Sequence, residues 1–404
     1  MKTKFALTTE IDDLDRAARD LTDQVNTDFP LLKNTCGILF CASDMDQKGL
    51  LKKIKEKFPY DIIGGTSVAV MTNEKGLNEM GICFMVLTAD DCQFIAQASD
   101  PILAQPSEVE EEVRKLYGRM KDKANEDIKT IFIFPPYNID LMMDSYTKSF
   151  NKIAPNIPVF GGIPSCKGED EKSATLFNDE VYTDRLVAVA VTGNMKPFFV
   201  KQKVSGSVVE RKRKVTSARF NTVYKVNDQP FTEYLKEIGL SLDEMTKGNS
   251  RITFVANPLL VENLPVEGYE EASFVRALHK IDVEEGSATS IGEIPEGSVV
   301  SVCSLRRDDI AEAASLAMDK IKKQIAGRQA EGYDYTTIFV VSCVGRYIFM
   351  MPKNSIEADN LISSMPQNMT LGGFYSCGEI APSCNLKNEQ YNFLHNESMV
   401  ICVF

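Results

Sequence analysis

Residues 371–380 read LGGFYSCGEI, and this stretch shows the pattern that the rest of the chain repeats. Gly372 and Gly373 follow an apolar segment, where adjacent glycines give the backbone room or positive φ angles. The side chains that follow carry hydrogen-bonding or reactive groups: Tyr375, Ser376, Cys377 and Glu379. We interpret the stretch as the lip of a pocket. The alternative is a bulged strand with Glu379 pointing into solvent.

The order of strand, helix and strand with two glycines occurs three times, within residues 36–67, 130–162 and 337–373. Beyond the second and third copies, residues 174–191 and 391–404 echo each other, which indicates an internal duplication into two related halves. The two earlier copies predict a secondary pocket in the N-terminal half, formed by Gly64, Gly65, Thr66, Ser67, Gly161 and Gly162.

Two kinds of strand pairing are expected. A strand that returns through a helix predicts a βαβ unit, whereas the extended stretches 81–94 and 252–261 lack an intervening helix and predict antiparallel pairs. The sequence therefore predicts an α/β fold with mixed sheets, in two tandem, internally related domains. We expect an N-terminal helical extension, a first domain, a linker strand with a basic run, and a second domain, at residues 1–35, 36–200, 201–220 and 221–404.

Composition limits the class of protein. A chain of 404 residues is expected to form two to three domains, and 44% hydrophobic with 25% charged residues is typical of a globular protein. The net charge of -12 argues against nucleic acid or an anionic membrane as partner. The local exception, RKRK at 211–214, is interpreted as a solvated linker face, with docking of an acidic partner as the alternative. We expect no membrane-spanning helix.

Ten cysteines occur at irregular spacing without a Cys-x-x-Cys pair, and residues 1–11 lack the apolar core of a signal peptide. The chain is therefore expected to be cytoplasmic and reduced. His279 and His395 are the two histidines, so no zinc or iron–sulfur site is expected. His279 lies near Ala277, Leu278 and Ile281, which predicts a partly buried structural residue on a helix.

Several segments, taken in order, resemble the FIST sensory proteins. They are GGTS at 64–67, PVFGG at 158–162, NTVYKVNDQP at 221–230, SCVGR at 342–346, GFYSCGEI at 373–380 and HN at 395–396. The resemblance covers the chain from about residue 36 to its end. It implies that residues 36–200 are a FIST N-terminal domain and residues 221–404 a FIST C-terminal domain.

The resemblance also implies a function. FIST proteins are intracellular sensory modules proposed to bind small ligands such as amino acids, often beside signalling outputs such as histidine kinases. Because the chain shows no output segment after the two halves, we expect a separate signalling partner, such as a histidine kinase. The oligomeric state stays open.

A pair of charges suggests how an amino acid is held. Arg346 follows the predicted strand 338–341, at the end where open α/β sheets present their crevices, and a guanidinium binds a carboxylate bidentately. Glu379 is expected to take the ammonium group. The alternative is a structural ion pair between Arg346 and Glu379. The predicted ligand-binding residues are Arg346, Cys343, Gly372, Gly373, Tyr375, Ser376, Glu379, His395 and Asn396.

Two other functions stay open. His395, interpreted first as a hydrogen-bonded structural residue, is also a candidate proximal haem ligand, because some FIST-like proteins are reported to bind haem and sense nitric oxide. We expect no cofactor, since the sequence has no haem attachment motif. A cysteine-dependent enzyme is the other alternative, with Cys343 or Cys377 as nucleophile and His395 as base. Small buried core cysteines are the commoner explanation, so no catalytic residue is predicted.

Overall fold

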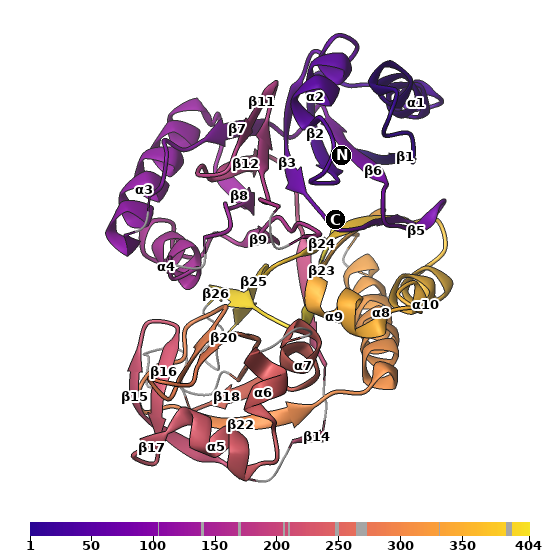
Figure 1. The fold of residues 1–404 in the computed structure, drawn as a ribbon. Coiled ribbons are helices and arrows are strands. Elements are labelled where there is room, and N and C mark those ends of the chain that lie inside the picture. The colour runs from indigo at the N-terminus through magenta and orange to yellow at the C-terminus, as the bar shows by residue number, and fades with distance from the viewer. Residues whose placement is uncertain are drawn as a thin grey trace.

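The computed structural model describes residues 1–103, 105–138, 141–168, 171–204, 207–208, 211–246, 250–263, 273–330, 332–384 and 390–404. Mixed parallel and antiparallel sheets with helices on their outer faces make up the fold (Figure 1), which confirms the predicted α/β class. No helix in the described ranges is long and apolar enough to cross a membrane.

Each of the three copies found in the sequence forms a repeat with a similar succession of elements, and the third has one helix more between its parallel strands. The first repeat contains β1 (Lys2–Thr8), α1 (Leu14–Asn26), β2 (Asn34–Cys41), α2 (Gln47–Lys55), β3 (Asp61–Thr66), the hairpin β4 (Val70–Thr72) and β5 (Gly76–Asn78), and β6 (Ile82–Ala89). The second contains β7 (Phe94–Ala98), α3 (Pro106–Lys123), β8 (Ile128–Phe134), α4 (Asp144–Ile153), β9 (Val159–Gly162), the hairpin β10 (Thr175–Phe177) and β11 (Glu180–Tyr182), and β12 (Val187–Thr192).

The third repeat is interrupted by an inserted domain. The repeat contains β13 (Phe198–Lys203), α8 (Arg307–Gln329), β23 (Thr337–Cys343), α9 (Val344–Met350), α10 (Ile356–Ser364), β24 (Thr370–Ser376), the hairpin β25 (Glu379–Cys384) and β26 (Gln390–His395), and β27 (Ser398–Val403). The inserted domain contains β14 (Ser207–Val208), β15 (Arg213–Arg219), β16 (Thr222–Val226), β17 (Gln229–Pro230), α5 (Phe231–Glu237), α6 (Leu242–Thr246), α7 (Ser250–Ala256), β18 (Leu259–Glu262), β19 (Phe274–Arg276), β20 (Leu278–Asp282), β21 (Ser287–Ser290) and β22 (Val299–Ser304). Its strands pair in a sheet of their own.

The repeats exchange their hairpins. The strand orders are β1-β6-β2-β3-β10-β11, β7-β12-β8-β9-β25-β26 and β13-β27-β23-β24-β4-β5, so each six-stranded sheet ends in the hairpin of another repeat. The hairpin β4–β5 of the first repeat joins the sheet of the third repeat, and β10–β11 of the second repeat joins the sheet of the first. The hairpin β25–β26 of the third repeat joins the sheet of the second. The exchange therefore closes a ring of three repeats. Two of them lie in the N-terminal half, and the third spans the C-terminal half.

A glycine stands at the same place in each repeat. In the parallel pairs β2–β3, β8–β9 and β23–β24, Gly64 is opposite Leu39, Gly161 opposite Ile133, and Gly373 opposite Val340. A Cβ atom on Gly161, whose φ is +149°, would lie 2.0 Å from the carbonyl oxygen of Ile133. This close approach of the two strands is why a glycine recurs there.

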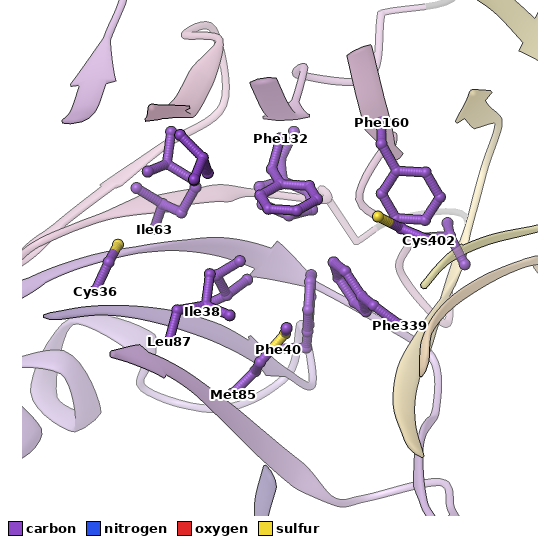
Figure 2. Close-up of a cluster of buried hydrophobic side chains, with 14 of the residues drawn as sticks. Cys36, Ile38, Phe40, Ile63, Met85, Leu87, Phe132, Phe160, Phe339 and Cys402 are labelled. Atoms are coloured by element: carbon purple, nitrogen blue, oxygen red, sulfur yellow. The ribbon is translucent and has the colours of Figure 1, made fainter. Parts of the chain in front are cut away.

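The inner faces of the three sheets share one core (Figure 2). Successive side chains of a strand point to opposite faces. Phe40 of β2, Phe132 of β8 and Phe339 of β23 point into the same cluster, where Phe339 lies 6.1 Å from each of the other two rings. Because this core is common to all three repeats, none of them has an interior of its own on that side.

The outer faces are covered by helices (Figure 1). Leu39 packs under α1 and α2, Ile133 under α3 and α4, and Val340 under α8 and α10, in three separate clusters. Strands buried on both faces are apolar throughout, as the sequence shows for residues 337–343. The inserted domain has its own core, which includes Val215, Tyr234 and Val302.

Some expectations from the sequence are changed by the structure. Residues 1–35 include β1, which pairs with β6 along its whole length, so this segment is an integral part of the first sheet. The antiparallel strand expected within 81–94 is confirmed as β6. Residues 252–261 were expected to be extended, but 252–256 belong to the helix α7, whose Phe254 packs in the inserted core.

Candidate functional site

A cavity of about 770 Å³ lies where the second repeat, the third repeat and the inserted domain meet. Its walls lie at the carboxyl ends of two strands, with Pro136 and Tyr137 just beyond β8 on one side and Cys343 and Val344 at the end of β23 on the other. Ligands of open α/β sheets bind outside this end of the strands. The volume is typical of a site for a small organic molecule.

Three parts of the chain supply the lining. The second repeat contributes Tyr146 of α4 and Cys166, which follows β9. The third contributes Gly345, Cys377 and Glu397. The inserted domain closes the cavity with a largely apolar wall formed by Phe254, Val255, Ala277, Leu278 and Ile291, with the exposed His279 beside it.

Glu397 is the most unusual residue of the lining. It is fully buried, and neither carboxyl oxygen has a nitrogen or oxygen hydrogen-bond partner among the described residues, while the thiol of Cys343 lies within hydrogen-bonding reach of the carboxyl. Its backbone adopts φ +49°, a left-handed conformation that is uncommon for glutamate. Burial raises the pKa of this carboxyl to about 8, although Arg346 acts in the opposite direction. Glu397 is therefore mostly protonated at neutral pH, and it can accept or donate one more strong hydrogen bond.

The carboxyl of Glu397 packs directly against Gly345. A Cβ atom at this position would lie 2.2 Å from Oε1 of Glu397. Glycine is therefore required for the carboxyl to lie against the start of α9, within the SCVGR segment that the sequence singles out.

Cys343 lies beside the same carboxyl, at the end of β23. The backbone N–H groups of Gly345 and Glu397 point to its sulfur and favour the thiolate. Burial, followed by the charges of Glu379 and Glu397, acts more strongly and raises the pKa of the thiol well above its ordinary value. Cys343 is therefore a neutral thiol that faces the cavity, and a thiol is a weak nucleophile.

Tyr146 brings a second unsatisfied polar group to the cavity. Its side chain is fully buried, and its hydroxyl has no hydrogen-bond partner within the described ranges. Burial raises the pKa of the phenol, so the hydroxyl stays protonated. Since buried polar groups are nearly always hydrogen-bonded and both residues line the cavity, Tyr146 and Glu397 are the candidates to hydrogen-bond a ligand.

Arg346 is paired with a carboxylate of the protein itself. It is completely buried, and its Nε donates to Oε2 of Glu357 at 2.7 Å, while its Nη2 lies 2.7 Å from the same oxygen. Ser342 donates to the other oxygen of Glu357. Arg346 lies beneath the cavity, outside its lining, because a buried guanidinium needs a carboxylate and α10 supplies one.

Glu379 does not pair with Arg346 either. It accepts a hydrogen bond from the hydroxyl of Ser376 at 2.9 Å and one from the backbone N–H of Ser398 at 3.2 Å. Burial raises its pKa well above the ordinary value. In this structure Arg346 and Glu379 are therefore held by different partners, and they do not form the ion pair that was the alternative to the zwitterion clamp.

The remaining predicted residues of the C-terminal half pack inside the protein. The backbone carbonyl of Tyr375 accepts hydrogen bonds from Ser67 at 3.0 Å and Ser165 at 2.6 Å, which ties the three repeats together. Gly372 lies against the ring of Phe5, where a Cβ would clash. These residues, with Gly373, Ser376 and Glu379, lie outside the lining of the cavity.

The histidines differ from expectation in different ways. His395 is 3% exposed, packs 5.8 Å from the ring of Phe274, and lies outside the cavity lining, as does Asn396. Burial, with the charges of Lys201 and Arg276, lowers its pKa well below the ordinary value. His279 is on the strand β20 instead of a helix, and it is exposed at the cavity.

The predicted N-terminal pocket residues also belong to the sheets. Gly64, Gly65 and Thr66 lie in β3, and Gly161 and Gly162 end β9. Ser67 bridges to Tyr375, as described above. All six are buried and lie outside the cavity lining, so their role in this structure is close strand packing and hydrogen bonding between repeats.

Comparison with protein families agrees with this arrangement. The chain matches the FIST N domain over residues 35–229 and the FIST C domain over residues 231–382. The chain belongs to the FIST family. FIST domains are associated with sensing in signal transduction. Curated proteins gave no match.

In this FIST protein, some residues of the cavity lining were named from the sequence and others were not. Cys343 was predicted, and Cys377 was considered as a nucleophile; both line the cavity. Glu397 and Tyr146 were missed, although Glu397 directly follows the predicted pair His395 and Asn396. A glutamate in a tight turn between two apolar strands was the signal that was available.

Proposed function

We propose that this FIST protein is a cytoplasmic sensor that binds an amino acid or a similar small metabolite in the cavity and signals through a separate protein, such as a histidine kinase. The observation that supports this most is that two buried polar side chains without a nitrogen or oxygen partner among the described residues, Glu397 and Tyr146, line a cavity of about 770 Å³. In this proposal Glu397 takes the place that the sequence assigned to Glu379 as partner of the ligand's ammonium group.

The walls of the cavity suggest how binding is transmitted. A ligand in the cavity contacts the repeats and the inserted domain together. These parts are also joined by Arg276, which is 3% exposed and donates to Oδ1 of Asp144 on α4 and to the carbonyl of Leu394 on β26, each at 2.9 Å. A ligand that draws the apolar wall inward would shift the inserted domain about this connection, and that change is available to a partner.

Calorimetric titration with a panel of amino acids and small amines tests the proposal. We expect at least one compound to bind the wild type. Ala277→Phe places a large side chain in the cavity from the apolar wall of the inserted domain, and it should weaken that binding at least tenfold. Leu316→Gln, on the exposed side of α8, should leave the binding unchanged. Circular dichroism establishes that both variants are folded. No binding to wild type, or equal binding to folded Ala277→Phe, would overturn the proposal.

A cysteine-dependent enzyme is the second candidate, because Cys343 faces the cavity beside Glu397. The raised pKa of its thiol favours the sensor. Haem sensing has less support, since His395 packs among aromatic rings away from the cavity.

A further inference from the structure

The charges of the cavity are unevenly distributed. Carboxyl groups line it at Glu171, Asp184 and Glu397, whereas Lys172 is the one lysine or arginine among the described lining residues. Lys172 is exposed at the rim, and Glu397 is fully buried. The buried end of the cavity therefore carries a carboxyl group, and it offers a ligand no buried positive side chain from the described part of the chain.

The groups around Glu397 leave its carboxyl without a dedicated counter-ion. Arg346 on α9 is the nearest cation, but it is held by Glu357 on α10 at 2.7 Å. Cys343 at the end of β23 is a neutral thiol, and Glu379 on β25 adds a second buried carboxyl, which repels a negative charge on Glu397. A positive charge from the cavity side is therefore the group that would satisfy Glu397 electrostatically.

We propose that the ligand presents a protonated amine to Glu397 and an apolar body to the wall around Phe254 and Leu278, and that the ion pair forms with release of the carboxyl proton. This inference rests on the proposed sensory function and specifies its ligand. The ammonium group replaces the proton of Glu397, and the released proton passes to solvent, so charge is conserved within the site. The Tyr146 ring adjoins the same space, where an aromatic face attracts a cation.

A carboxylate on the ligand is not required by this arrangement. The predicted binder of that group, Arg346, is occupied by Glu357 outside the lining, and Glu171 and Asp184 repel an anion at the cavity. We therefore expect a simple amine to bind more tightly than the amino acid with the same side chain.

The test is isothermal titration calorimetry with matched probes: phenethylamine, hexylamine and cyclohexylmethylamine, against phenylalanine and the neutral phenethyl alcohol and hexanol. Titrations at pH 6, 7 and 8 in two buffers of different ionisation enthalpy report the protons released. We expect an amine to bind with close to one proton released at pH 7. Its affinity should rise by up to about tenfold per pH unit towards pH 8, and the matched alcohol should bind at least tenfold more weakly.

Two variants separate this charge effect from general binding. Glu397→Gln keeps the shape of the side chain and should abolish proton release and weaken amine binding at least tenfold. Glu312→Gln, which removes a carboxylate from the exposed side of α8 outside the cavity lining, is the control and should leave the affinity unchanged. Binding of amino acids or alcohols without proton release would overturn this inference and leave the sensor proposal standing. If no compound of any class binds, both fail.

Discussion

At the scale of single residues, Glu397 combines three unfavourable features. Its carboxyl is buried, both oxygens lack nitrogen and oxygen partners among the described residues, and its backbone φ of +49° is unusual for a glutamate. Each of these costs folding free energy. Such a residue is expected where function, instead of stability, determines the side chain.

Replacing Glu397 should therefore change how stability depends on pH. Folding raises the pKa of the Glu397 carboxyl from 4.5 to about 8. The contribution of protonated Glu397 to the free energy of unfolding is therefore fully present below about pH 4.5, and it is lost as the pH rises through about 8. Glu397→Gln should match wild type near pH 5 and exceed it by a few kcal/mol at pH 9. Urea denaturation at both pH values measures this. Glu312→Gln, at an exposed position of α8, is the control. An equal change in the free energy of unfolding between the two pH values for Glu397→Gln and wild type would contradict the expectation.

A second prediction at this scale concerns the cavity thiols. Cys343 should react slowly with iodoacetamide at pH 7.5, because burial and the neighbouring carboxyl groups raise its pKa. Cys377 is less buried and is the matched comparison within the same cavity. Peptide mass spectrometry after brief exposure measures both. A uniquely fast Cys343 would support the cysteine enzyme over the sensor.

At the scale of elements, the recurrent glycine is what makes the parallel strand pairs possible. Gly161→Ala should destabilise the protein by several kcal/mol, because its Cβ would lie 2.0 Å from the carbonyl oxygen of Ile133 in a rigid neighbouring strand. Gly118→Ala, inside α3 with nothing within 4 Å of the added Cβ, should instead stabilise it by about 0.5–1 kcal/mol. Chemical denaturation of the two variants measures both effects, and equal effects would remove the steric explanation.

The elements also show what the sequence allowed us to predict. Residues 36–42 and 337–342 were recognisable as strands because they are apolar on both faces, and the double glycines marked their neighbours. His279 was misplaced because the apolar spacing of Ala277, Leu278 and Ile281 also fits a strand with a bulge, which β20 has between Leu278 and Lys280. Short segments with mixed spacing are decided by their tertiary partners.

The site was less predictable than the elements for a related reason. Arg346 and Glu379 have the residue types of an amino-acid clamp, but the first is paired by Glu357 from α10 and the second by Ser376 and Ser398. The carboxylate that pairs with a buried guanidinium is decided by how the helices pack. The sequence around Arg346 and Glu379 therefore does not show which residues pair with them. Cys343 was found because its position at a strand end is a local property.

At the scale of the whole molecule, the three repeats are tied into a ring. The hairpin β25–β26 pairs with β9 through residues more than 200 positions apart in sequence, and β4–β5 pairs with β24. Pairing over such distances leaves no short-range pattern, so the sequence showed the copies and their order but not the exchange. The shared core around Phe40, Phe132 and Phe339 has the same consequence, since each ring comes from a different repeat.

The ring predicts that neither half folds alone. A fragment of residues 1–195 keeps the first two repeats but leaves β9 without β25 and the hairpin β4–β5 without β24. It also exposes the central aromatic cluster, whose third side is supplied by Phe339 and Phe374. We expect this fragment to bind the dye ANS and to lack near-ultraviolet circular dichroism, and we expect co-expression with residues 196–404 to restore both native signals. A fragment 1–195 that is monomeric, cooperative in urea and silent towards ANS would show that the exchanged hairpin is dispensable for folding.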